Sequence, residues 1–384
     1  MKIDVAKVQE SILISTFMIL SLTGLVNIGD YNFLNATVIF EGLFFLMALL
    51  SLFFLRNDYS GYVFQIVFVA FFVVNFILMK MGEPRDIKDF LQAYKAFIYA
   101  PFLVFFINAK IISLEKSVSL FGVLLFVFIL KYALSLALGF DRPGVYTENN
   151  FELGFLMLFY LAVADHLGDK KLIYFVALAV VVALSGSRSA MVALVLLYVF
   201  IYLRGVSIKT VIKIIPLIAL SLLAIYIFSD RMVGDVYTID RVKFLEVFIY
   251  QISNWEWYNF LFGTYPITPL DAQGCIALQY YKVLFSYSGD GSCYSVVLHS
   301  YLLRILFDNG IFGLILLMVF YTWIMRKARL ETWKVLAFLS IVFCNSLSVS
   351  AVNSVYFSLG IMFLLLSNRW CEKDAASSFV KENK

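Results

Sequence analysis

Three arginines and one histidine are the residues of this chain best suited to chemistry on a phosphorylated substrate. They are Arg142, Arg188, Arg241 and His299. Arginine stays charged and offers a planar fork of N–H donors to phosphate oxygens, so it can bind a diphosphate and stabilise its charge as it leaves. Histidine exchanges a proton near neutral pH and can take one from a sugar hydroxyl. Together these residue types predict glycosyl transfer from a polyprenyl diphosphate donor.

The local sequence around three of these residues favours a site. Arg142 begins Arg142-Pro143-Gly144, and Arg188 follows Ser185-Gly186-Ser187, whose small side chains let a headgroup approach the backbone. His299 precedes Gly310-Ile311-Phe312-Gly313, whose glycines permit either close helix packing or a break in a helix. Taken singly, an arginine at a span end is explained equally by lipid headgroup contact, and a lone histidine is more often structural. Their convergence on one predicted side of a membrane favours function.

The sequence shows no other signature of a known reactive centre. No group of carboxylates has the spacing of metal ligands, and there is no P-loop, nucleophile elbow or zinc motif. We therefore expect no metal ion and no other cofactor. The net charge of +4 gives no indication of nucleic-acid binding, and none is expected.

The composition indicates a polytopic, all-α membrane protein. Hydrophobic residues make up 62% of the 384 residues and charged residues 15%, and the mean hydropathy is +0.90. Soluble domains have about 45–50% apolar and about 25% charged residues, because their surface must be wetted. We expect one integral membrane domain over residues 1–384, with a single long loop at 229–298.

Apolar runs long enough to cross a bilayer recur about twelve times. The predicted spans are 10–28, 34–55, 62–80, 93–109, 118–138, 151–167, 172–186, 189–203, 211–228, 300–325, 335–352 and 354–368. Glu41 and Lys131 fall inside spans, where ionisable groups are costly and often functional. Both could also lie near a helix end or in a wet cavity.

Basic residues predict the orientation of these spans. An even number of spans with a cytoplasmic N-terminus places 18 of the 30 lysines and arginines in inner segments, as the positive-inside rule requires. Both termini then lie in the cytoplasm, and the 229–298 loop lies outside. The four candidate residues all fall on this outer side.

The long loop contains its own predicted elements. Asp240 is a suitable N-cap, and Val242, Leu245, Phe248, Ile249 and Ile252 recur at helical spacing, which predicts an amphipathic helix at the membrane interface. Cys275 and Cys293 lie further along the loop. They either form a disulfide or remain two free thiols, because sequence alone gives no distance between them.

Several motifs resemble the O-antigen ligase/polymerase superfamily of bacterial envelope glycosyltransferases. The matching pieces are Ser185-Gly186-Ser187-Arg188-Ser189-Ala190 at the start of a span, Arg241 with Gly263 after it, and His299-Ser300 with Leu303, Gly310 and Gly313. Their order and the long loop before His299 also match, over roughly residues 140–325.

The resemblance implies a GT-C-like, metal-independent enzyme at the periplasmic face of the bacterial inner membrane. Its partners would be undecaprenyl-diphosphate-linked oligosaccharide, membrane lipid and a chain-length regulator protein. His299 would activate the acceptor hydroxyl, and Arg188 and Arg241 would bind the diphosphate. Arg142 matches a weaker family position that could bind glycan or phosphate.

The superfamily contains two activities with the same donor. A polymerase extends a lipid-linked chain, and a ligase transfers the finished chain to lipid A–core. Arg142-Pro143-Gly144, with Glu148-Asn149-Asn150 and the Phe-rich spans, favours the polymerase over the ligase.

Two other classes remain open from the sequence. A flippase or transporter would be expected to place more polar groups in the middle of its spans, with symmetry between its halves. A receptor-like protein without catalysis is the third class.

Overall fold

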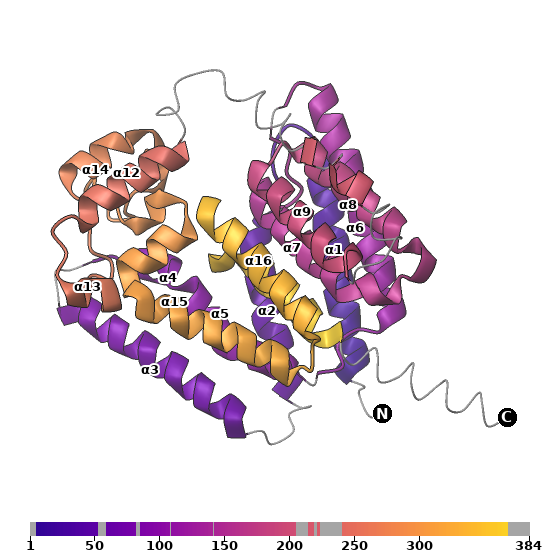
Figure 1. Cartoon of the computed structure of the whole chain (residues 1–384), viewed down its shortest axis with the longest axis horizontal. Coiled ribbons are helices and arrows are strands. Elements are labelled where there is room, and N and C mark those ends of the chain that lie inside the picture. Colours follow the sequence, from indigo (N-terminus) through magenta and orange to yellow (C-terminus); the bar gives the residue numbers. More distant parts are fainter. Residues whose placement is uncertain are drawn as a thin grey trace.

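The computed structural model describes residues 5–52, 59–81, 85–107, 109–140, 142–204, 214–218, 221–222 and 240–367. Every regular element within these ranges is helical, which confirms the all-α prediction there (Figure 1). The predicted span 211–228 lies largely outside the described residues.

Helices occupy the other predicted spans. They are α1 (Val5–Val26), α2 (Ala36–Ser51), α3 (Tyr59–Met81), α5 (Lys95–Leu103), α6 (Leu114–Ala137), α7 (Asn149–Val163), α8 (Lys171–Ser185), α9 (Arg188–Tyr202), α15 (Tyr301–Lys327), α16 (Thr332–Ser348) and a final helix, Val355–Ser367. By length and composition, α1, α6, α15 and the Gly61–Met81 part of α3 could each cross a membrane, and several others are shorter apolar helices. The count of about twelve spans stays a prediction.

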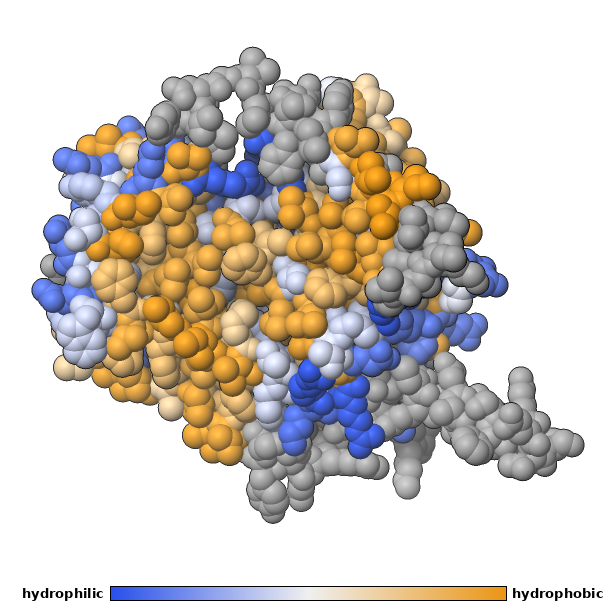
Figure 2. All heavy atoms as spheres, in the orientation of Figure 1, coloured by the Kyte–Doolittle hydropathy of each residue, from blue (hydrophilic) through white to orange (hydrophobic). Residues whose placement is uncertain are grey.

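The apolar pattern of each helix matches its place in the bundle. Helix α7 is buried on every side from Leu153 to Val163 and stacks Phe159 on Phe363 of the final helix, with ring centroids 3.9 Å apart. A helix that is apolar all round belongs in the interior. By contrast, only 11% of the apolar window of α3 is buried, and Figure 2 shows a broad hydrophobic face over this part of the molecule.

Between α9 and α15, the stretch of residues 240–300 folds into a helical cap with a small core of its own. It contains α12 (Asp240–Ile252), α13 (Trp257–Phe262), α14 (Ala272–Ala277) and two 3-10 turns, η6 (Gln279–Leu284) and η7 (Ser295–Leu298). The predicted helix at Asp240 is confirmed. Its buried stripe is Phe244, Val247 and Phe248, packed against Leu298 and its neighbours. Leu245 and Ile249 are exposed, and contact of that side with a membrane stays a prediction.

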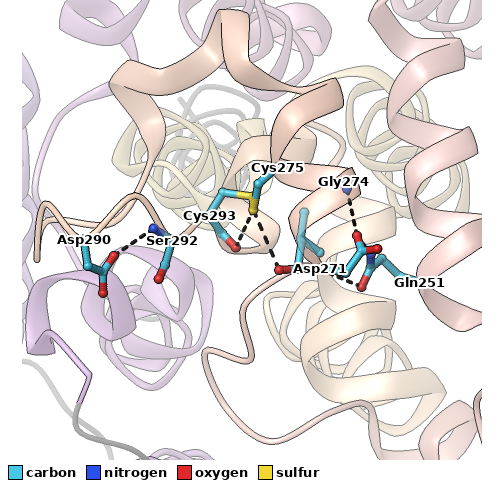
Figure 3. Close-up of a disulfide and its surroundings, with 8 residues drawn as sticks. Gln251, Asp271, Gly274, Cys275, Asp290, Ser292 and Cys293 are labelled. Carbon is cyan, nitrogen blue, oxygen red and sulfur yellow. Dashed lines mark hydrogen bonds between the residues drawn. A yellow bond between two sulfur atoms is a disulfide. The ribbon is translucent and has the colours of Figure 1, made fainter.

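A disulfide joins Cys275 to Cys293 inside this cap (Figure 3), which decides between the two alternatives that the sequence left open. Nearby, Asp271 caps α14 by accepting the N–H of Gly274 at 2.8 Å and also accepts from the Gln251 amide of α12. These links connect α12 and α14 to the segment that leads into η7. They therefore fix the part of the chain that ends at His299.

Glycine allows the cap to dock into a break in α15. Gly310 lies inside α15 with non-helical angles, φ 62° and ψ −166°. A Cβ at Gly310 would lie 2.4 Å from the carbonyl oxygen of Leu261, and one at Gly263 would lie 2.5 Å from the backbone nitrogen of Asn309. The two backbones touch where a side chain could not fit. Gly310 thus serves both the close packing and the helix break that the sequence left as alternatives.

Candidate active site

A cavity of about 450 Å³ brings together all four candidate residues. Arg142, Arg188, Arg241 and His299 line it, although they come from four separate segments of the chain. The remaining lining residues are Glu148, Asn149, Asn150, Ser185, Gly186, Ser187, Phe244, Tyr281, Ser348 and Val349. The lining residues come from the starts of α7 and α9 in the bundle, from α12, Tyr281 and His299 in the cap, and from the end of α16.

Four helices begin at this cavity. Asn149 is the first residue of α7, Arg188 is the first of α9, and Arg241 is the second of α12. His299 stands two residues before α15. Helix starts carry partial positive charge and exposed N–H groups, which favour anions. Within the described part of the chain, the lining contains three guanidinium groups and one carboxylate, that of Glu148. This arrangement of cationic groups and helix starts suits an anion.

The turn between α8 and α9 positions Arg188. Gly186 ends α8 in the left-handed conformation, with φ 60°. Ser187 then caps α9, its side-chain oxygen accepting the N–H of Ala190 at 3.3 Å. The cap places Arg188 in the first turn, where its side chain reaches the cavity.

The start of α7 holds this turn in place. The Asn149 amide donates to the carbonyl of Ser185 at 3.1 Å, and the Ser187 hydroxyl donates to the side-chain oxygen of Asn150 at 2.6 Å. The motif at residues 148–150 and the motif at residues 185–188, which lie apart in the sequence, are thus joined directly by hydrogen bonds.

The loop that carries Arg142 is fixed by a buried carboxylate. Glu152 is 0% exposed and accepts backbone N–H groups of Val145 at 3.0 Å, Tyr146, and Thr147 at 2.7 Å. Arg142 itself is exposed, and within the described ranges it has no hydrogen-bond or ion-pair partner. Its guanidinium group is held near the cavity with its donors uncommitted to those residues.

His299 adopts an unusual backbone conformation two residues before the start of α15. Its φ is 50°, a left-handed value that costs a non-glycine residue about 1–3 kcal/mol and that often marks a functional site. Ser350 donates to the His299 carbonyl at 2.9 Å, and Ser300 begins α15 as its N-cap. The imidazole lies against the ring of Tyr281, at 4.7 Å between centroids, and near Phe244.

Four lining residues were missed by reasoning from the sequence, namely Phe244, Tyr281, Ser348 and Val349. Phe244 and Tyr281 form the aromatic wall beside His299, and the buried hydroxyl of Ser348 has no hydrogen-bond partner in the part of the chain that the structure describes. The alternating serines Ser346, Ser348 and Ser350 at the end of a span were a usable signal for the third. No local pattern distinguishes Phe244 or Tyr281 from other cap aromatics.

Neither metal ligands nor relatives identify the reaction. The described residues contain no group of three or more His, Cys, Asp or Glu side chains able to hold a metal ion, and the absence of a metal stays a prediction. No protein-family model matches the chain, and no curated protein matches it.

Proposed function

We propose that this protein is a membrane glycosyltransferase that uses a glycan linked to undecaprenyl diphosphate as its donor. The observation that supports this most is the meeting of three arginines, four helix starts and one histidine around a single cavity. The cationic groups suit a diphosphate, and the histidine suits activation of a hydroxyl. The O-antigen polymerase is the first candidate within this class.

In the proposed step, His299 takes the proton of an acceptor hydroxyl. The acceptor oxygen attacks the anomeric carbon of the donor sugar, and the bond between that carbon and the diphosphate oxygen breaks. Undecaprenyl diphosphate leaves with the electron pair. Arg188 and Arg241, together with the starts of α9 and α12, stabilise the negative charge that grows on it. The chemistry requires no redox partner.

We place the reaction at the periplasmic face of the bacterial inner membrane, in a GT-C-like fold, with an associated chain-length regulator. A gene deletion followed by lipopolysaccharide electrophoresis tests the assignment. A single repeat unit on the core identifies a polymerase. Core without any O-chain, together with accumulated lipid-linked polymer, identifies the ligase alternative. Normal long-chain polysaccharide contradicts both activities.

The role of His299 is tested by comparing the only two histidines. His299→Ala should lower the rate of glycan transfer by about 100–10,000-fold, because a general base contributes that much, while binding of the lipid-linked donor persists. His166→Ala is the matched control, since His166 lies in the connection between α7 and α8 and should leave the rate unchanged. Normal transfer by His299→Ala rules out its role as the base.

A further inference from the structure

A second cavity of about 230 Å³ adjoins the first and shares Arg142 with it. Its walls are the α1–α2 connection, residues 28–31, and the α6–α7 connection, which carries Phe140, Pro143 and Gly144. The proposed reaction needs two substrates, and the first cavity accounts for the diphosphate and the reacting hydroxyl. The second cavity has no role in that step.

A buried lysine builds the first wall. Lys131 of α6 is 0% exposed, and its ammonium group donates to the carbonyls of Asn27 and, at 3.0 Å, of Asp30. Ser135, one turn further along α6, donates to the carbonyl of Ile28 at 2.9 Å. The ionisable group found inside a span thus holds the 27–30 turn, which leaves the side chains of Asp30 and Tyr31 exposed.

The two walls interlock through aromatic rings placed over glycines. A Cβ at Gly144 would lie 2.7 Å from the Tyr31 ring, and one at Gly29 would lie 2.9 Å from the Phe140 ring. Each connection therefore contributes one aromatic ring that packs on the backbone of the other. Glu152 fixes the second connection from below by its backbone hydrogen bonds. Two buried ionisable residues, Lys131 and Glu152, thus shape one cavity through their hydrogen bonds.

The lining selects an uncharged, hydroxyl-rich ligand. Asp30 offers acceptors, Arg142 offers donors, and the Tyr31 phenol offers both. Burial and the nearby Glu148 and Glu152 carboxylates raise the pKa of this phenol, so it stays protonated and able to donate. Among the lining residues that the structure describes, one carboxylate accompanies one guanidinium group, which disfavours a second diphosphate. Both charges disfavour a prenyl tail. The volume lies below the roughly 300–1,000 Å³ of sites for drug-sized ligands, so it suits a single sugar ring.

We propose that this cavity is a sugar-binding subsite in which Asp30 and Tyr31 recognise one residue of the lipid-linked glycan. The proposal rests on the proposed function, and it adds specificity-determining residues that lie outside the reacting centre. Arg142 connects the two cavities and would contact the glycan where it leaves the diphosphate site.

Binding of two probes to the purified full-length protein tests the subsite. One probe is the lipid-linked repeat unit isolated from cells that lack this protein, and the other is undecaprenyl diphosphate without glycan. Tyr31→Ala and Asp30→Asn should each weaken binding of the first probe by about tenfold or more, as expected for lost hydrogen bonds to or from a charged or phenolic group. Binding of the second probe should not change. Tyr265→Ala, at an exposed tyrosine of the cap, is the control and should affect neither.

The outcomes separate the subsite from the proposed function. Unchanged binding of the glycan-bearing probe in both variants overturns the subsite. Equal weakening of the binding of both probes also overturns the subsite, because these residues then maintain the structure of the loop. In that case Tyr31→Phe shows whether the aromatic ring alone restores binding. Loss of bare-lipid binding in Arg188→Lys supports the diphosphate site independently, and its persistence contradicts the proposed function instead. Steady-state kinetics of the two variants, with the polymer donor and the single-unit acceptor varied in turn, show which substrate carries the recognised sugar. A raised KM for one substrate alone identifies that substrate. An unchanged KM for both substrates overturns the subsite.

Discussion

Arg188 is held at the cavity by a helix cap and by hydrogen bonds of the turn that precedes it. It follows the cap residue Ser187, and that turn is bonded to Asn149 and Asn150. Arg188→Lys keeps the charge and removes the planar fork, so kcat/KM for glycan transfer should fall by about 10–100-fold. Arg326→Lys, at the far end of α15 where Arg326 bonds Thr332, is the control. Equal kcat/KM values for Arg188→Lys and Arg326→Lys would contradict a role of Arg188 in diphosphate binding.

Glu152 is a buried residue whose carboxyl group fixes the loop that carries Arg142 and does not contact the cavity itself. Glu152→Gln leaves one oxygen where two now accept three backbone N–H groups and the Tyr132 hydroxyl. We expect a loss of about 1–3 kcal/mol in stability, measured as a lower melting temperature of the detergent-solubilised protein. Glu115→Gln, at an exposed position in the first turn of α6, should melt like the unsubstituted protein. Equal melting of the two variants would contradict this role.

At the scale of elements, the break in α15 decides how the cap meets the bundle. Gly310→Ala would force a side chain into a backbone conformation that is essentially restricted to glycine, and against the Leu261 carbonyl, at a cost of about 1–3 kcal/mol or more. Gly42→Ala in α2 is the matched control, since a Cβ there meets nothing within 4 Å and alanine favours a helix by about 1 kcal/mol. Thermal unfolding should separate the two in opposite directions, and a Gly310→Ala protein as stable as the parent would contradict the docking role.

The helices could be predicted because their signal is local. Each apolar run extends over enough residues to define a helix, and the helix predicted to begin at Asp240 is α12. The role of the Asp240 side chain as its N-cap stays a prediction. The buried stripe of α12 could not be predicted as well. Phe244 and Val247 face inward because Leu278 and Leu298, far along the chain, supply the surface they pack on. Helical spacing alone fits several stripes of an apolar helix equally well.

At the scale of the whole molecule, the sequence predicted which residues share a side and did not predict how they meet. Alternation of spans places Arg142, Arg188 and His299 at one end of the helices, and the structure brings them to one cavity. The second cavity depends on Lys131 reaching the carbonyls of Asn27 and Asp30 across the bundle, a contact with no local signature. Residue types predict the chemistry of the candidate residues, and the pattern of spans predicts on which side of the membrane they lie. The walls of the cavities depend on long-range packing and could not be predicted.

The opposite end of the bundle carries a cluster of three basic residues around one carboxylate. Asp165, after α7, pairs with Lys334 at 2.8 Å, Lys171 at 3.5 Å and Arg204 at 3.7 Å. Burial alone would raise the pKa of Asp165, but these three cations lower it overall, so the carboxylate stays ionised. Figure 2 shows hydrophilic residues gathered where α15 ends. The positive-inside rule predicts that this end is cytoplasmic and that the cavity end faces the periplasm.

A labelling experiment tests this orientation. Tyr265→Cys places a thiol at an exposed position of the cap, and Asp169→Cys places one in the exposed connection before α8. A membrane-impermeant maleimide applied to spheroplasts should label the first variant and spare the second until the membrane is permeabilised. The unsubstituted protein gives the background labelling. Because the two sites lie at opposite ends of the same bundle, the reversed pattern would put the cavity in the cytoplasm. A periplasmic glycan transfer would then be impossible, whatever the residues in the cavity can do.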